Sequence, residues 1–146
     1  MVMKKDEVLK TGEKIENLVM VSPELKSFKS KVGGLGDVAE ELSQEVANLG
    51  IKTTLVSLLY KRARYDVKQN NTTVKCIQNI DYSDIPIEDT GKTIKIEVAD
   101  ERLKAQIKTS KIGKATVLFI YNEIYADMGY SGDLLSQAIF LGRSTM

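Results

Sequence analysis

A glycine-rich loop in front of an amphipathic helix constrains the fold of this chain more than any other feature. The sequence KVGGLGD at 31–37 puts three glycines in four positions, and it lies between two apolar runs, NLVMVS at 17–22 and TTLVSLLY at 53–60. Continuous apolar runs of this length are typical of strands buried on both faces of a parallel sheet. The order strand, glycine loop, helix, strand predicts a βαβ unit with a right-handed crossover.

The helix of this unit is predicted from apolar residues at helical spacing. Val38, Leu42, Val46 and Leu49 recur every three or four positions, and Gly50 follows them as a stop signal. These four residues form the apolar side of the predicted helix.

Beyond the βαβ unit the pattern changes. KRAR at 61–64 is interpreted as a solvated loop, with a phosphate-binding patch as the less favoured alternative, and TVKCIQNI at 73–80 as a strand. TIKIEVAD at 93–100 and LKAQIKTS at 103–110 alternate apolar and polar residues, which indicates a half-exposed antiparallel pair. KATVLFIYN at 114–122 is again continuously apolar and predicts a core strand. The sequence therefore predicts an α/β fold with a Rossmann-like, mostly parallel sheet, helices on both faces and an antiparallel β-hairpin insertion.

The domain organisation follows from the two ends of the chain. We assign 1–15 to a charged N-terminal lead and 16–146 to one incomplete Rossmann-like domain. The last predicted helix begins after Ser131 or Gly132, carries an apolar face and reaches the end of the chain without a cap signal. We therefore expect the chain to be part of a larger domain.

Composition excludes several classes of function. The chain has 146 residues and a net charge of +1 from 21 basic and 20 acidic residues, so charge gives no argument for nucleic acid or an acidic membrane as partner. The apolar runs are too short to span a bilayer, and the first residues lack the apolar core of a signal peptide. Cys76 is the only cysteine and is expected to be a buried thiol. We expect a cytoplasmic protein.

The chain contains no histidine. Its absence excludes histidine general acid–base catalysis and nearly all zinc sites within these residues. We assign no catalytic residue, no metal and no cofactor.

The glycine loop has the parts of an anion site. Glycine lets a ligand come close to the backbone, and the helix N-terminus offers free amides and a favourable dipole. Lys31 adds a mobile positive charge. The spacing matches neither G-x-G-x-x-G nor a Walker loop, so a tight structural turn and an anion site stay about equally supported. Asp37 is either an acidic first-turn residue, which local physics favours, or a ligand contact.

A resemblance to a known family adds to this interpretation. KVGGLGDVAEELSQEVANLGIKTTLVSLLY resembles the start of the bacterial glycogen and starch synthases, whose G-G-L-G-D-V motif follows a lysine. VLFIYNEIYADMGYSGD is similar to the family's V-Y-F-I-D-N-x-x-Y-F-D…Y-G, with Tyr121 in place of the aspartate before the asparagine. Arg143 lies near the end of the family's next helix.

The resemblance implies a metal-independent, retaining glucosyltransferase with two Rossmann domains. Such an enzyme transfers glucose from ADP-glucose or UDP-glucose to an α-1,4-glucan acceptor, and the nucleotide sugar is a substrate, not a cofactor. The residues implied in binding the donor phosphates and sugar are Lys31, Gly33, Gly34, Gly36 and Asp37. The possible sugar contacts are Asn122, Tyr125 and Tyr130, although core or rim packing is the commoner role of aromatic residues near strand ends.

Three hypotheses about the function of the chain stay open. The chain ends before the family's H-x-H-D-W region and second domain, so we expect it to be inactive alone and to need the C-terminal domain, in trans if necessary. A non-catalytic sugar-nucleotide, glucan-binding or regulatory module is the alternative, and a homodimer through the last helix is a third hypothesis.

SPELKSFKSK at 22–31 is interpreted either as a mobile acceptor-facing loop or as an ordinary solvated loop.

Overall fold

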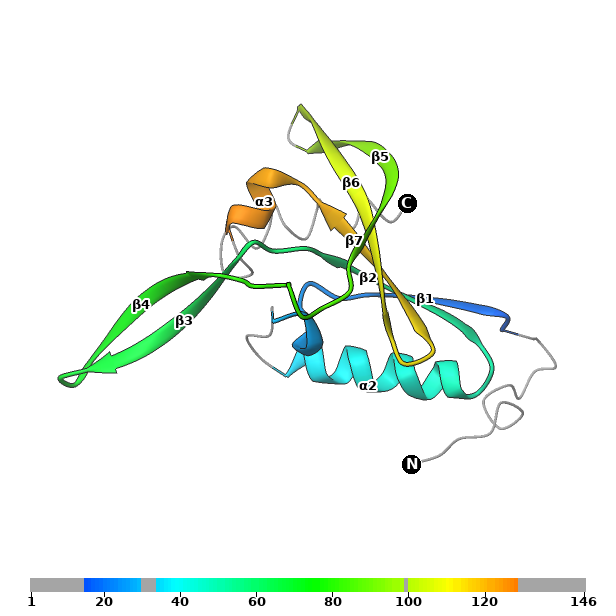
Figure 1. Cartoon of the computed structure of the whole chain (residues 1–146), viewed down its shortest axis with the longest axis horizontal. Coiled ribbons are helices and arrows are strands. Elements are labelled where there is room, and N and C mark those ends of the chain that lie inside the picture. The colour runs from blue at the N-terminus through cyan, green and yellow to red at the C-terminus, as the bar shows by residue number, and fades with distance from the viewer. Residues whose placement is uncertain (1–14, 30–33, 99, 129–146) are drawn as a thin grey trace.

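The structure is a computed structural model that describes residues 15–29, 34–98 and 100–128, with the backbone alone at 64, 65 and 128. The predicted last helix and most of the N-terminal lead lie outside the described residues. The elements in chain order are β1 (Asn17–Val21), η1 (Lys26–Phe28), α2 (Leu35–Asn48), β2 (Lys52–Leu58), β3 (Arg62–Gln69), β4 (Thr72–Asn79), β5 (Glu88–Val98), β6 (Glu101–Ile112), β7 (Ala115–Tyr121) and α3 (Glu123–Met128) (Figure 1).

The main sheet has five strands in the order β1-β2-β7-β6-β5. β1 and β7 both pair with β2 in parallel, whereas β6 is antiparallel to β7 and β5 is antiparallel to β6. The predicted βαβ unit is confirmed as β1, α2 and β2, and the predicted antiparallel pair is β5 and β6. The Rossmann-like α/β prediction is confirmed, with the sheet mixed because the β5–β6 hairpin extends it beside β7.

Helices cover both faces of this sheet. On the α2 face, Leu25, Phe28, Leu55 and Phe119 form a core cluster with Ala39 of the helix. The rings of Phe28 and Phe119 meet edge to face with their centroids 4.7 Å apart. The second cluster joins Tyr125 of α3 to Val56, Leu58 and Tyr60, together with side chains from β5 and β6.

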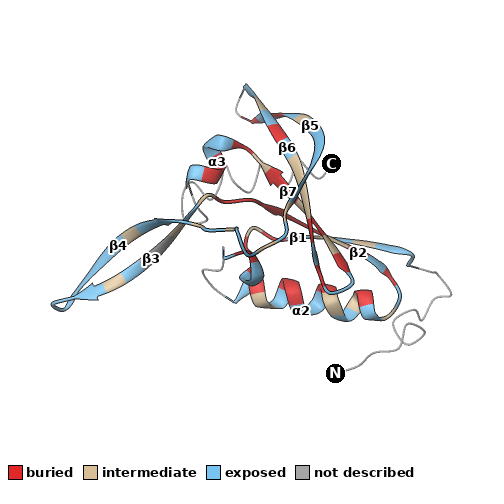
Figure 2. Cartoon of the chain, viewed as in Figure 1, coloured by how far each residue is buried: buried red, intermediate tan, exposed pale blue. Residues whose placement is uncertain are grey.

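The side of α2 that faces the sheet differs from the apolar side expected from the sequence. Val38 is 59% exposed and Leu42 is 44% exposed. The buried residues of the helix are small or acidic, and they are Gly36, Ala39, Glu40, Ser43 and Ala47 (Figure 2). Small side chains let the helix lie close to the sheet and to the segment that precedes the glycine loop, so close packing decided the orientation of α2.

β1 corrects a second expectation. The apolar run at 17–22 does form a strand, but Val19 is 59% exposed and Val21 is 48% exposed, so the strand is not buried on both faces. Met20 packs against the α2-face cluster, so its neighbours Val19 and Val21 point to the opposite face, which the described elements leave uncovered at this edge strand.

β3 and β4 form a separate two-stranded hairpin that projects from the main sheet (Figure 1). The interpretation of 61–64 as a loop was wrong beyond Lys61, because β3 begins at Arg62. Asn70 and Asn71 turn the hairpin, both at positive φ, as in type I′ turns. Cys76 was expected to be buried, but it lies on this hairpin, apart from the main sheet, and is partly exposed. None of the helices in the described ranges is long and apolar enough to cross a membrane.

Candidate functional site

The three parallel strands end at one edge of the sheet. β1 leads into the segment 22–29 and the glycine loop, β2 into Tyr60 and Lys61, and β7 into Asn122 and α3. Ligands of open α/β sheets bind outside the carboxyl ends of the strands. This edge is therefore the candidate functional site.

The segment 22–29 is packed against the fold, which corrects both loop interpretations for its described part. Leu25 is fully buried and Phe28 is nearly so, and both belong to the α2-face core cluster. Glu24 is 1% exposed, and its Oε1 accepts a hydrogen bond of 3.0 Å from the Gly36 amide. Glu40 of α2 accepts bonds of 2.6 and 2.7 Å from the amide and hydroxyl of Ser27. Two carboxylates thus fasten this segment to the helix.

Sequence reasoning missed Glu24 and Glu40 as structural residues. Glu24 lies in a lysine-rich stretch and Glu40 beside a second glutamate, so each has the sequence environment of a solvated charge. Only their burial of 1% and 5% shows that they are part of the interior.

The described glycines of the loop have different surroundings. A Cβ on Gly36 would lie 3.2 Å from the backbone nitrogen of Lys26 and 3.4 Å from the carbonyl oxygen of Glu24. The missing side chain at Gly36 therefore lets the protein's own backbone come close. A Cβ on Gly34 would meet nothing within 4 Å, and this glycine is exposed, so its backbone is open to a ligand. Lys31 and Gly33 lie outside the described residues.

Asp37 lies in the first turn of α2, where the helix dipole favours an acidic side chain. Its carboxylate is 3.8 Å from the Lys26 ammonium, and its side chain is 30% exposed. This geometry matches the first-turn interpretation, and the ligand contact of Asp37 stays a prediction.

Asn122, directly after β7, and Tyr125 of α3 lie at the same edge, but their side chains make contacts inside the protein. The Asn122 Oδ1 accepts a bond of 3.0 Å from the Ile124 amide at the start of α3, and its Nδ2 donates one of 2.8 Å to the Lys104 carbonyl. The Tyr125 side chain is 5% exposed in the second core cluster. Tyr130 lies outside the described residues. The sugar contacts of all three stay predictions.

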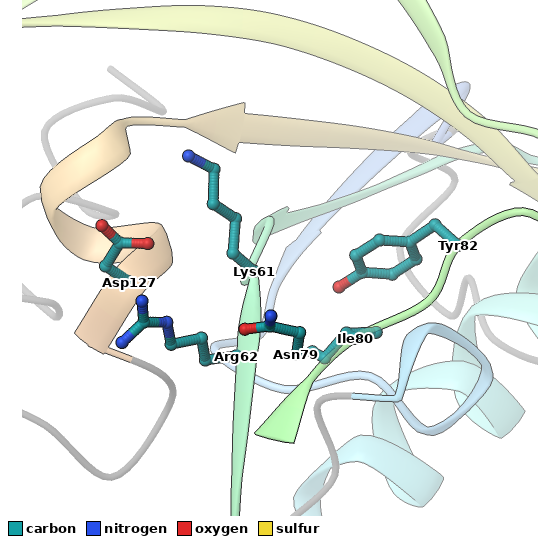
Figure 3. Close-up of a pocket in the computed structure, with 6 residues that line it drawn as sticks. All are labelled: Lys61, Arg62, Asn79, Ile80, Tyr82 and Asp127. Carbon is teal, nitrogen blue, oxygen red and sulfur yellow. The ribbon is translucent and has the colours of Figure 1, made fainter. Parts of the chain in front are cut away.

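A pocket of about 500 Å³ opens at this edge, where the base of the β3–β4 hairpin meets α3. We call it the hairpin pocket. Figure 3 shows its lining side chains, which come from the start of β3, from the end of β4 and the segment after it, and from α3, and they are Lys61, Arg62, Asn79, Ile80, Tyr82 and Asp127. No local sequence pattern predicts this pocket, because its lining residues come from three separate stretches of the chain.

Backbone and side-chain hydrogen bonds fix the walls of the hairpin pocket. The Lys61 amide donates to the Ala126 carbonyl at 2.9 Å, and its own carbonyl accepts from the Ile80 amide at 2.8 Å. The Tyr82 hydroxyl donates to the Tyr60 carbonyl at 2.6 Å. Burial raises the pKa of Tyr82 well above its usual value, so this hydroxyl keeps its proton.

The Lys61 ammonium points to two neighbours. It lies 5.5 Å from the centre of the Tyr121 ring and 3.4 Å from Oε1 of Glu123. Hydrogen bonding to Tyr121, supported by the nearby Glu123 charge, raises the pKa of Lys61 above its ordinary value. Lys61 therefore stays positively charged.

The comparisons with known proteins agree with this Rossmann-like α/β fold. A family model described as the starch synthase catalytic domain matches residues 17–145. The chain belongs to the starch synthase catalytic domain family. The match includes every element of the described structure, from β1 to α3.

One solved structure of the starch synthase family shows the same fold. It is the catalytic domain of starch synthase IV from Arabidopsis thaliana, bound to ADP and acarbose, with a TM-score of 0.65 and 17% sequence identity. The match covers 90% of the present chain and 24% of that chain. No curated protein sequence matches the chain.

Proposed function

We propose that this chain is the N-terminal part of a glycogen or starch synthase-like glucosyltransferase. The enzyme transfers glucose from ADP-glucose or UDP-glucose to an α-1,4-glucan, and the nucleotide sugar is its substrate, with no metal or other cofactor. The observation that carries the proposal is the family match over 17–145, which includes a glycine loop at the carboxyl edge of a parallel sheet.

The glycine loop receives the phosphates of the donor in this proposal. The exposed backbone at Gly34 admits a phosphate oxygen, and the N-terminus of α2 favours its negative charge. Glu24 accepts the hydrogen bond of the Gly36 amide and so ties the start of α2 to the buried segment 22–29. Lys31 supplies the positive charge that stabilises the diphosphate as it leaves.

Catalysis needs more than this chain. Donor, acceptor and leaving-group contacts must be held together for glucosyl transfer, and the chain spans 24% of the length of the starch synthase IV structure. We therefore propose that these residues alone bind but do not transfer, that a C-terminal domain supplied in cis or in trans completes the cleft, and that the protein acts in the cytoplasm.

A non-catalytic binding or regulatory module is the second candidate. The absence of histidine from the chain favours it, because the most common general acid–base residue is missing. In this case the same edge binds a sugar nucleotide or a glucan without chemistry, and the assembly with other domains has a regulatory role.

Calorimetric titration with ADP-glucose, UDP-glucose and ADP tests the donor site. Lys31→Ala is compared with Lys52→Ala, which removes an exposed lysine at the amino end of β2, away from the loop. Loss of one charge-assisted contact is worth about 1.5–3 kcal/mol, so Lys31→Ala is expected to weaken binding about ten- to a hundred-fold. Lys52→Ala is expected to bind as the parent does. Equal affinity in both variants, or no binding of any nucleotide to the folded parent chain, refutes the donor site.

A further inference from the structure

We propose that the outer edge of β1, together with one side of α2, is the interface of a homodimer in which two copies of this chain pair β1 with β1. The inference goes beyond the proposed function and does not depend on it. It rests on three features of this edge, which are its outward-pointing backbone groups, its lack of charge and the apolar side of α2 that lies next to it.

β1 directs backbone hydrogen-bonding groups away from the sheet. The Ser22 amide donates to a β2 carbonyl at 3.0 Å, and the Glu16 carbonyl accepts from a β2 amide at 3.1 Å, so the even-numbered positions face β2. Successive residues of a strand point their backbone groups to opposite sides. The N–H and C=O groups of Asn17, Val19 and Val21 therefore point outward, where the described chain has no further strand.

β1 and β5 are the two edges of the main sheet, and they differ in how they are protected against pairing (Figure 1). Edge strands are usually protected by charged side chains, by proline or by β-bulges. β5 carries Lys95 and Glu97, and its pairing with β6 shifts register between Asp89 and Thr93. β1 is NLVMV, with no charge and no proline, and its register with β2 is continuous. The sheet is therefore open to pairing at β1.

One side of α2 adds an apolar stripe next to this edge. α2 lies over β2 and contacts β7 on one side and β1 on the other. Gln44 marks the β7 side, since its Oε1 lies 3.3 Å from the position that a Cβ on Gly113 would take in the β6–β7 turn. The stripe consists of apolar residues about half a turn around the helix from Gln44, and they are Leu35, Leu42, Val46 and Leu49. The stripe is therefore turned toward the β1 side, and Leu35 and Leu42 are 48% and 44% exposed.

A second copy supplies both of the groups that this edge can bind, a strand edge and an apolar helix side. Antiparallel pairing about Val19 puts Val19 opposite its own counterpart and Asn17 opposite Val21. Because each such pair exchanges both of its backbone bonds, about six hydrogen bonds form between the copies. The two-fold axis is perpendicular to the sheet, so both α2 helices lie on the same face and turn their stripes toward each other. Such an interface closes at two copies.

The other free edges of the described strands fit β1 less well. β5 would place Lys95 and Glu97 against the uncharged strand, and β3 and β4 carry Asp66 and Lys75. A contact between β1 and any of these edges would be head to tail, and head-to-tail contacts form rings or filaments rather than dimers. The lack of charge along β1 therefore points to a second β1 as its partner.

The first test is sedimentation of the full chain over a wide range of concentration. The parent is expected to form a dimer at high concentration. Val19→Lys places two like charges opposite each other at the axis, and Leu42→Lys places one in each stripe, so each is expected to weaken dimerisation at least about ten-fold. Ile77→Lys is the matched control, because Ile77 of β4 is 56% exposed and Val19 is 59% exposed. This control is expected to dimerise as the parent does.

Hydrogen exchange at single residues tests the edge without any substitution. The amides of Val19 and Val21 are expected to become protected as the concentration of the parent chain rises, because they donate to the second copy. The amides of Leu18 and Met20 point toward β2 and are expected to be equally protected at all concentrations.

Four results would overturn the inference. One is a parent chain that is monomeric at every concentration. Another is a dimer that Val19→Lys and Leu42→Lys weaken no more than Ile77→Lys does, since it forms through a different surface. Species that grow beyond the dimer would show head-to-tail contacts. Protection of Val19 and Val21 only after a C-terminal domain is added in trans would mean that this domain, and not a second copy, occupies the edge.

Discussion

Replacing Gly36 with alanine tests whether the glycine loop is shaped by packing inside the protein. The new Cβ would lie 3.2 Å from the Lys26 nitrogen, 3.4 Å from the Glu24 carbonyl oxygen and 3.4 Å from the Leu25 Cα. All three are backbone atoms of a segment that is held by buried side chains, so the segment cannot move aside as a flexible side chain would. Gly34→Ala is the matched control, since a Cβ there meets nothing within 4 Å.

The magnitude follows from two opposing effects. Alanine is better than glycine inside a helix by about 1 kcal/mol. Overpacking of a close contact costs about 1–3 kcal/mol. Gly36→Ala is therefore expected to lower the free energy of unfolding by about 0–2 kcal/mol, since the two effects subtract. Gly34→Ala has no close contact and φ of −86°, which alanine adopts readily, so its effect is expected to stay within about 0.5 kcal/mol.

Urea unfolding followed by circular dichroism measures the difference between the two variants. We expect Gly36→Ala to be less stable than Gly34→Ala by about 1 kcal/mol, the middle of the range derived above, with unchanged m-values. Hydrogen exchange at residue 36 is a second readout, because its amide donates to the buried Glu24 carboxylate. If Gly36→Ala is as stable as Gly34→Ala and its amide is equally protected, the close backbone contact is not what requires glycine at this position.

Three further predictions concern buried groups and the orientation of α2. Glu24→Ala leaves the buried Gly36 amide without its acceptor and is expected to cost about 1–3 kcal/mol in urea unfolding, whereas Glu24→Gln keeps an acceptor and is expected to cost less; equal losses would show that the bond does not matter. The folded-state pKa of Tyr82 is raised above its ordinary value of 10.0, so its stabilising contribution is complete below that pH and is lost as the pH rises above it. Tyr82→Phe is therefore expected to lose less stability than the parent between about pH 9 and 11, and parallel pH curves would contradict this. Leu55→Ala is expected to lower the free energy of unfolding by about 2–5 kcal/mol and Val38→Ala by about 0.5 kcal/mol or less, since Leu55 is fully buried and Val38 is 59% exposed. A larger loss for Val38→Ala than for Leu55→Ala in thermal or urea unfolding would mean that α2 turns Val38 toward the core.

The sequence predicted those parts of the fold that depend on local pattern. The apolar runs at 17–22 and 53–60 predicted two parallel strands, and the alternation at 93–100 and 103–110 predicted an antiparallel pair. Both predictions were possible because the spacing of apolar residues along a strand indicates which of its faces are buried. The start of α3 also has a local signal, since Asn122 followed by Glu123 is a typical helix start.

The orientation of α2 could not be predicted in the same way. Apolar periodicity points to Val38 and Leu42, but the helix packs through Gly36, Ala39 and Ser43, whose small size allows a close approach. The burial of Glu24 depends on a partner twelve positions away, the Gly36 amide. Tertiary contacts decide both the orientation of α2 and the burial of Glu24, and the hydrophobic pattern of the sequence does not predict such contacts.

The candidate site was predictable only in part for the same reason. The glycine loop is continuous in sequence, and so its place at the carboxyl edge followed from the βαβ order. The hairpin pocket joins Lys61, Asn79 and Asp127 from distant stretches. Only the pairing of β3 with β4 and the bond from the Lys61 amide to α3 bring these residues together.

The central claim is that the carboxyl edge of β1, β2 and β7 is a nucleotide-sugar half-site, and amide chemical shifts on titration with ADP-glucose test it most directly. We predict saturable shifts that are largest between Gly34 and Asp37, with smaller ones at Tyr60 and Lys61. Gly113, in the β6–β7 turn at the opposite end of the sheet, is expected to stay unshifted. A well-dispersed spectrum that ADP-glucose leaves unchanged, or shifts centred on Gly113, would contradict the account.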